Sequence, residues 1–407
     1  MKRFWLHGLV LIFFPGITYV GIGLSMSLGL IACSLIGILI ELKILFKNTI
    51  KPIHFLYFLI IFLVFFLWGL YAYIEYNELK PLLSSLIVLL FVYAYVISLA
   101  LIKSDFNTIN KFLNSLRMLT YLLIFFGWIK LTLGSDFGPY ANHPKALFPY
   151  AEDSHFALTF AMFSMGFIAG CKNNNIEVFF ILINILIFGL LLPSLTMLVV
   201  FFLGLILHFI KKNRATRYLF FLSILFLSTT IFSALITLDY FSERFDVSSL
   251  SNLTLLVWIQ GWFIMISSLQ YTNFLGIGFQ MLGLNLEALP EISFYINDLF
   301  NMGFYNIEDG SFFAVKLVSE LGIFGIFIVV YYLKNLMSAY RFLTMVNSDH
   351  IYSKKDKLLL KICSGFIFAF SIEMFLRGLS YFSVGVIILI IAILVYRRVS
   401  SKITKII

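Results

Sequence analysis

Residues 53–74 read IHFLYFLIIFLVFFLWGLYAYI, a run without a single Asp, Glu, Lys or Arg. About 20 apolar residues in a helix are enough to span the hydrocarbon core of a bilayer. Comparable runs recur through most of the 407-residue chain, which is 61% hydrophobic and only 12% charged. Because no soluble core could hide these runs, the sequence predicts an all-α, polytopic integral membrane protein.

Taking each long apolar run as one span predicts about twelve transmembrane helices. The 48 Phe and 21 Tyr residues fit lipid-facing and interfacial positions. The expected spans are residues 4–20, 23–46, 53–74, 81–102, 116–133, 155–171, 176–192, 194–210, 217–238, 312–333, 357–376 and 379–396.

The basic residues predict the orientation of these spans, because cytoplasmic connections carry an excess of Lys and Arg. With the N-terminus inside, alternate connections hold 23 of the 29 Lys and Arg residues, and 15 of the 20 acids lie on the outer face. Both termini are therefore expected in the cytoplasm, and the net charge of +9 needs no nucleic-acid partner. The outer cations are Lys80, Lys130, Lys145, Arg244, Lys316 and Arg377.

The lengths of the connections divide the chain into three parts. Residues 1–238 hold nine spans and an outer loop near 134–154, and residues 239–311 form one large outer loop. Within it, amphipathic stretches such as 255–269 are expected to lie near the membrane surface. Residues 312–407 hold the last three spans and a basic tail. One large outer loop favours an enzyme or assembly factor that works on the outer face, which in bacteria is the periplasmic side of the inner membrane.

Residues 145–158 read KALFPYAEDSHFAL and hold the most suggestive cluster of polar side chains. In the structural interpretation, Asp153 or Ser154 caps the helix that follows, and the acids favour its positive end. In the functional interpretation, Glu152 and His155 form a base that deprotonates an acceptor hydroxyl at the membrane surface. Local chemistry leaves these two alternatives open.

Two pairs of opposite charge stand at i, i+4 helical spacing, Lys316 with Glu320 and Glu373 with Arg377. A lone charge within the membrane costs on the order of 3 kcal/mol, so such groups face a partner or a wet cavity. Either the pairs neutralise each other and anchor two helix ends, or they line a functional cavity. Two pairs on one membrane face favour the cavity.

The remaining sequence features give weaker indications of function. Arg244, in the large loop, could clamp a phosphate through bidentate hydrogen bonds. Residues 275–279, LGIGF, lack the strand and helix of a dinucleotide site, so we expect a close-packed turn. No pattern predicts a metal site or a cofactor, and the three cysteines have neither disulfide nor metal-binding spacing.

Three segments resemble stretches of a known family. AEDSHFA at 151–157 resembles the Glu-Pro-Ser-His-Phe-Ala signature of bacterial O-antigen and exopolysaccharide polymerases, the Wzy family, within the wider polymerase and ligase group. DGSFFAVKLVSELGIFG at 309–325 and LGIGF are similar to other stretches of that family. Asp153 stands where the family has Pro, whereas Glu152 and His155 match the signature, so these two inherit its candidate roles and Asp153 does not.

The resemblance implies a glycosyltransferase without a cofactor. A growing glycan on undecaprenyl pyrophosphate is transferred onto an incoming lipid-linked repeat unit at the periplasmic face. The implied catalytic residues are Glu152 and His155, with Arg377, Arg244, Lys145 and Lys316 for the pyrophosphate, and Glu320 and Glu373 as supporting charges. The implied partners are the lipid-linked oligosaccharide, the bilayer, and a flippase and chain-length regulator of the same pathway.

Three alternatives remain, of which the last two are from other classes. An O-antigen ligase has a similar architecture, but ligases rely on a histidine in the large loop, and no His lies between His208 and His350. A flippase or other transporter would show short loops and inverted repeats, neither of which is evident here. A membrane scaffold would not need paired charges.

Overall fold

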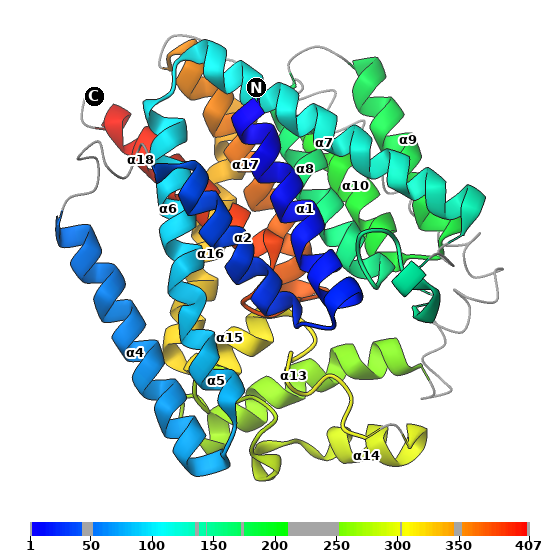
Figure 1. The fold of residues 1–407 in the computed structure, drawn as a ribbon, viewed down its shortest axis with the longest axis vertical. Helices are drawn as coiled ribbons and strands as arrows, with labels where there is room; N and C mark the ends of the chain where they lie inside the picture. Colours follow the sequence, from blue (N-terminus) through cyan, green and yellow to red (C-terminus); the bar gives the residue numbers. More distant parts are fainter. Residues whose placement is uncertain are drawn as a thin grey trace.

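The computed structural model describes residues 2–42, 52–134, 138–143, 145–171, 175–210, 252–301, 303–345 and 352–404. All regular elements in these ranges are helices (Figure 1). The longer ones are α1 (Lys2–Ile22), α2 (Met26–Ile40), α4 (Pro52–Tyr76), α6 (Ile87–Lys103), α7 (Phe106–Leu133), α8 (Asp153–Gly170), α9 (Asn175–Leu191), α10 (Leu195–Ile210), α13 (Leu253–Tyr271), α14 (Glu291–Phe300), α16 (Ile323–Met345), α17 (Lys354–Phe375) and α18 (Val384–Thr404). The short ones are α5 (Leu79–Leu83), η2 (Ser84–Leu86), η3 (Gly138–Asn142), η4 (Leu286–Ala288) and α15 (Phe313–Leu321).

The prediction of a helical membrane protein is confirmed. Within the described ranges, eight helices are long and apolar enough to cross a membrane, and three shorter apolar helices accompany them. Every expected span overlaps helical structure, except 217–238, which lies outside the described residues; 81–102 is divided among α5, η2 and α6, and 312–333 between α15 and α16. The number of crossings stays a prediction, because length and composition also admit α13, which Figure 1 draws across the bundle axis.

The expected span at 312–333 is wrong in its extent. The helix is broken at Gly322, so α15 ends at Leu321 and the membrane-length helix begins at Ile323. Gly322 has φ +57°, a conformation that favours glycine. The amide of Ile323 donates to the carbonyl of Phe274 at 2.9 Å, which ties the break to another loop. Lys316 and Glu320 therefore lie on a separate short helix and not inside a span.

The centre of the bundle is the contact between α17 and α8. Of the 22 residues of Lys354–Phe375, 15 are buried. Small residues let the two backbones approach: a Cβ on Gly365 would lie 2.3 Å from the carbonyl oxygen of Met165, and one on Gly166 would lie 2.2 Å from the ring of Phe366. This close packing fixes the position of the two helix ends that carry Glu152 and Arg377.

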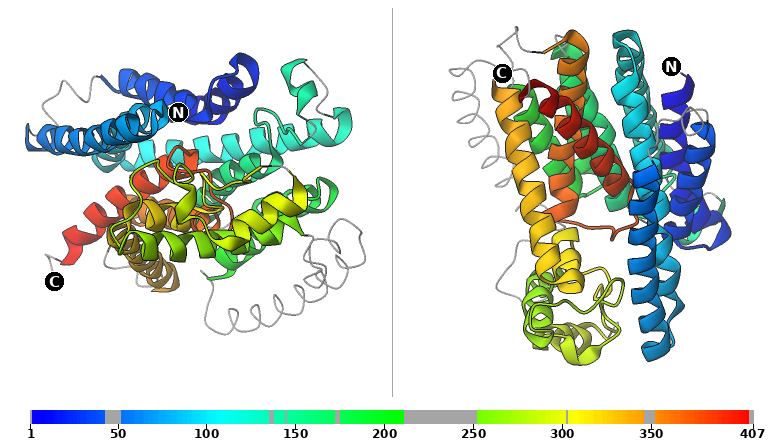
Figure 2. Two further views of the ribbon diagram at one scale, coloured as in Figure 1. Left: turned by 90° about the horizontal axis from the view of Figure 1, so that it is seen from below. Right: turned by 90° about the vertical axis from the view of Figure 1, so that its left-hand side faces the viewer.

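A layer formed by α13, α14 and α15 covers one end of the bundle, which we call the loop end. Both termini lie at the opposite end (Figures 1 and 2). Gln260 of α13 donates to Ser293 of α14 at 2.9 Å, and both side chains are buried. The stretch 255–269, expected to be helical and to lie near the surface, belongs to α13, which runs across the bundle axis.

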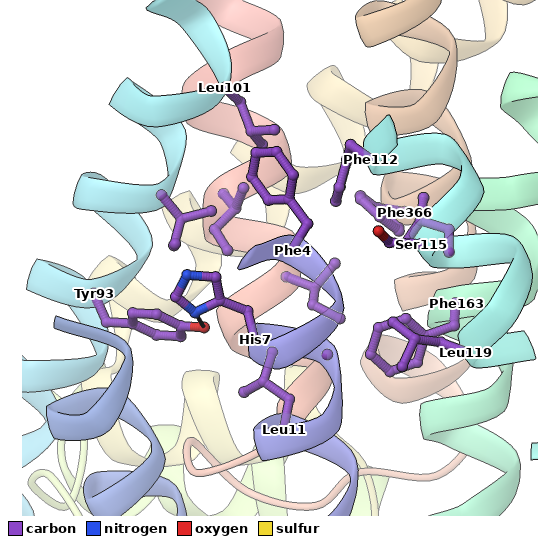
Figure 3. Close-up of a pocket in the computed structure, with 15 residues that line it drawn as sticks. Phe4, His7, Leu11, Tyr93, Leu101, Phe112, Ser115, Leu119, Phe163 and Phe366 are labelled. Atoms are coloured by element: carbon purple, nitrogen blue, oxygen red, sulfur yellow. Dashed lines mark hydrogen bonds between the residues drawn. The ribbon is translucent and has the colours of Figure 1, made fainter. Parts of the chain in front are cut away.

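A polar network joins α1, α2 and α6 in the half of the bundle nearer the termini. Glu41, 1% exposed, is ion-paired with Arg3 and lies 2.9 Å from Nε2 of His7. Nδ1 of His7 lies 3.1 Å from the hydroxyl of Tyr93, beside a small, mostly apolar cavity of about 50 Å³ (Figure 3). His7 therefore contacts two buried polar groups at once, the Glu41 carboxylate and the Tyr93 hydroxyl.

We expect Gly322→Ala to destabilise the protein more than Gly134→Ala. Both glycines have positive φ, so each alanine costs about 1 kcal/mol in backbone strain. A Cβ on Gly322 would also lie 2.1 Å from the carbonyl oxygen of Phe274, whereas nothing lies within 4 Å of one on Gly134. Thermal unfolding of the two variants in detergent measures the difference. Equal unfolding temperatures would show that the break at Gly322 is not held by Phe274.

Candidate functional site

The start of α8 carries the cluster expected around residue 152. Glu152 is the N-cap, and its side chain makes no cap hydrogen bond, so the expected capping by Asp153 or Ser154 is wrong. Instead, Oε2 of Glu152 accepts a hydrogen bond from Ser154 Oγ at 3.1 Å and lies 3.7 Å from Nε2 of His155. Glu152 is 46% exposed and His155 only 16%. The carboxylate is therefore the accessible member of the pair.

The segment that leads into α8 is fixed by two tyrosines. Tyr150 is 1% exposed and accepts a hydrogen bond from Thr159 at 2.9 Å. Tyr140 donates to the carbonyl oxygen of Pro149 at 2.8 Å. Lys145, at the start of this segment, lies close enough for its charge to act on Glu152. No sequence pattern marks the two tyrosines, because their role depends on contacts between elements.

Arg377 lies beside Glu152 and not beside Glu373. Its Nη2 is 3.3 Å from Oε2 of Glu152. The expected i, i+4 pair with Glu373 requires α17 to continue to residue 377, but the helix ends at Phe375 and the amide of Arg377 bonds back to the carbonyl of Ile372 at 3.0 Å. The chain leaves the helix path there, which turns Arg377 towards α8.

Glu373 occupies a separate, buried place at the start of α18. It is 2% exposed and hydrogen-bonds Ser383, which also caps the helix by accepting from the amide of Val386 at 2.9 Å. A Cβ on Gly385 would lie 1.9 Å from Oε2 of Glu373, so only glycine leaves room for the carboxylate. The positive end of a helix dipole favours a negative group at this position.

A second charged group surrounds Lys316 on α15. Its ammonium is 3.3 Å from Oε1 of Glu320 and 3.7 Å from Oδ1 of Asp309, and it donates to the backbone oxygen of Glu308. Lys316 is 1% exposed and Glu320 is fully buried. The expected pair is therefore confirmed, and its cation is surrounded by oxygens of the protein.

Glu320 in turn holds the loop that contains LGIGF. Its carboxylate accepts hydrogen bonds from the amides of Gln280 at 2.7 Å and Leu282 at 3.4 Å. The close-packed turn expected at 275–279 is confirmed, because a Cβ on Gly276 would lie 2.4 Å from the amide of Gly322. Two motifs separated by about 40 residues of sequence thus form one packed unit.

The two charged groups are linked through the backbone, because the carbonyl of Ser311, two residues after Asp309, accepts from the amide of Gly378, the residue after Arg377, at 3.0 Å. The charge of Asp309 acts on His155, as do those of Glu152 and Arg377. Partial burial would raise the pKa of Glu152, but the charges of His155 and Arg377 and the Ser154 hydrogen bond lower it below its ordinary value. Glu152 is therefore ionised at neutral pH.

The structure thus brings together most of the site residues expected from the sequence: Glu152, His155, Arg377, Lys145, Lys316 and Glu320. Glu373 lies apart, and Arg244 falls outside the described residues. Asp309 was not among the candidates, although it directly precedes Gly310 in the motif at 309–325. Within the described ranges, no three His, Cys, Asp or Glu side chains are grouped to hold a metal ion.

No family model, curated protein or solved structure matches this chain. The function is therefore argued from the geometry of the charged cluster and from the sequence motifs that form it.

We expect Lys316→Met to destabilise the protein by about 3 kcal/mol or more, because it leaves the Glu320 carboxylate buried without its cation. Adding Glu320→Gln should recover much of that loss, since the amide oxygen can still accept from a backbone amide. Lys80→Met is the control: Lys80 and Glu308 form an exposed pair, which contributes below about 1 kcal/mol. Thermal unfolding of the full-length protein distinguishes these cases. A double variant that unfolds at a lower temperature than Lys316→Met would contradict the pairing of Lys316 with Glu320.

Proposed function

We propose that this chain is a glycosyltransferase that polymerises polyprenyl-pyrophosphate-linked repeat units of a surface polysaccharide at the outer face of the bacterial inner membrane. The observation that carries the proposal is the contact of Arg377 with Glu152 at the start of α8, with His155 adjacent. It puts an ionised carboxylate and a guanidinium at one partly exposed point, next to the backbone hydrogen bond between Gly378 and Ser311.

In the proposed reaction, a hydroxyl of the acceptor repeat unit attacks the anomeric carbon of the donor glycan. The bond from that carbon to the pyrophosphate oxygen breaks, and polyprenyl pyrophosphate leaves with the bonding electrons. Glu152 takes the proton of the attacking hydroxyl, because its carboxylate is ionised and more exposed than His155. His155 and Ser154 orient that carboxylate.

The leaving pyrophosphate needs positive charge, which Arg377 is placed to supply. A guanidinium keeps its charge and can bind two phosphate oxygens at once. Arg377 is 33% exposed, and its Nε has no hydrogen-bond partner among the described residues. Lys145 adds a second charge nearby. Lys316 is enclosed by Glu320, Asp309 and Glu308, so its part is to hold the loops in position.

Deletion of the gene in its host tests the proposed activity. We expect the polysaccharide ladder on a gel to collapse to core plus a single repeat unit, because units are still made and attached but not joined. Bare core would identify a ligase instead. An unchanged ladder would exclude both activities.

Glu152→Gln and Arg377→Ala should each reduce chain polymerisation by roughly 100-fold or more, the range expected for removing a general base or a charge clamp. Glu287→Gln is the control, because Glu287 is an exposed carboxylate outside the cluster. The measurement is ladder formation in the deletion strain at equal membrane levels of each variant. Wild-type ladders from both site variants would leave these residues with a structural role only.

Arg377→Gln should also shift the pH dependence. The charge of Arg377 contributes to lowering the pKa of Glu152, so its loss raises that pKa and protonates the base at higher pH. We expect the acid limb of the rate profile to move to higher pH in initial-rate measurements on purified protein. A limb that stays in place or moves lower would contradict Glu152 as the base.

A further inference from the structure

Asp309 stands out as a charged group of the site that the proposed mechanism does not use. Its side chain is 48% exposed, comparable to Glu152 at 46%. Its loop is joined to the site by the backbone, since the carbonyl of Ser311 accepts from the amide of Gly378, the residue after Arg377, at 3.0 Å, and its charge acts on His155. Oδ1 is 3.7 Å from the ammonium of Lys316, which leaves the carboxylate room for further hydrogen bonds.

The loop that carries Asp309 is held firmly. Gly310 and Ser311 have positive φ, +64° and +72°, and such strain in a non-glycine residue persists only where its surroundings impose it. Ser311 donates to the backbone oxygen of Val257 on α13, and its own carbonyl accepts from the amide of Gly378 at 3.0 Å. The loop therefore bridges α13 and the segment that carries Arg377.

Lys316 fixes the same loop from within. It is buried, donates to the backbone oxygen of Glu308, and is itself held by Glu320. A buried cation that contacts one exposed carboxylate sets where that carboxylate lies without covering it. Glu308, the adjacent carboxylate, points elsewhere, because it pairs with Lys80.

We propose that Asp309 is an acceptor-binding residue, whose carboxylate accepts hydrogen bonds from saccharide hydroxyls next to the one that reacts. A carboxylate has about four lone-pair positions and accepts from two neighbouring hydroxyls readily. Glu152 then takes the proton from the reacting hydroxyl while Asp309 sets the orientation of the sugar ring. This inference rests on the proposed transferase activity and extends it to the recognition of the acceptor.

The test uses full-length protein in lipid nanodiscs, with a polyprenyl-pyrophosphate-linked repeat unit as both donor and acceptor. Because one compound plays both parts, a lipid-free saccharide of the same repeat unit is added as a variable acceptor at fixed donor. We expect Asp309→Asn to raise the KM for that acceptor at least tenfold, with kcat changed less than threefold. Glu308→Gln, the matched control, should change neither.

Three results would overturn the inference. Unchanged kinetics in Asp309→Asn would show that the carboxylate does not contact the acceptor. A fall in kcat with an unchanged KM would place Asp309 in the chemical step. An equal rise in KM in Glu308→Gln would show that the effect of Asp309→Asn comes from the loss of a negative charge in the region and not from contact with the acceptor. Wild-type protein that transfers nothing would instead reject the proposed function, which separates the two failures.

Discussion

The burial of the Lys316 ammonium is the constraint on which the loop end depends. A charge removed from water must be surrounded by oxygens, and here these come from Glu320 on the same helix and from Asp309 and Glu308 on the preceding loop. Glu320 is also buried and recruits the amides of Gln280 and Leu282. One ion pair thus determines how two stretches of the loop layer meet.

The position of the contact between Glu152 and Arg377 is set by the packing of the helix bundle. Close packing of α8 on α17, through Gly365 and Gly166, holds the ends of both helices in fixed positions. Glu152 begins one helix and Arg377 follows the other, so their contact at 3.3 Å is a consequence of helix packing. The rigid bundle supplies one half of the charged cluster and the loop layer supplies the other. The proposed transferase, with two lipid-linked substrates, needs such a fixed reference point, because orientation of the reactants supplies much of the rate.

The sequence predicted what depends on composition and local spacing. Apolar runs identified the helices, and the i, i+4 spacing within α15 identified the pair of Lys316 with Glu320. The same rule failed for Glu373 and Arg377, because α17 ends between them and the backbone turns away.

The break at Gly322 was missed for a related reason. The residues on both sides are apolar, so the run looked continuous, and only the contact with Phe274 shows why the chain must bend there. Asp309 was missed because it has no charged partner at i, i+3 or i, i+4 spacing, and its contact with Lys316, seven residues further on, depends on the fold. Contacts between elements that are distant in the chain cannot be predicted from a single sequence, whereas helical periodicity can.

The most direct test of the proposed activity is product analysis by mass spectrometry, with purified protein and a polyprenyl-pyrophosphate-linked repeat unit as the sole substrate. Polymerisation predicts lipid-linked products of two and more repeat units, with one free polyprenyl pyrophosphate released for each bond formed. Recovery of the unaltered single unit, with no polyprenyl pyrophosphate released, would contradict it.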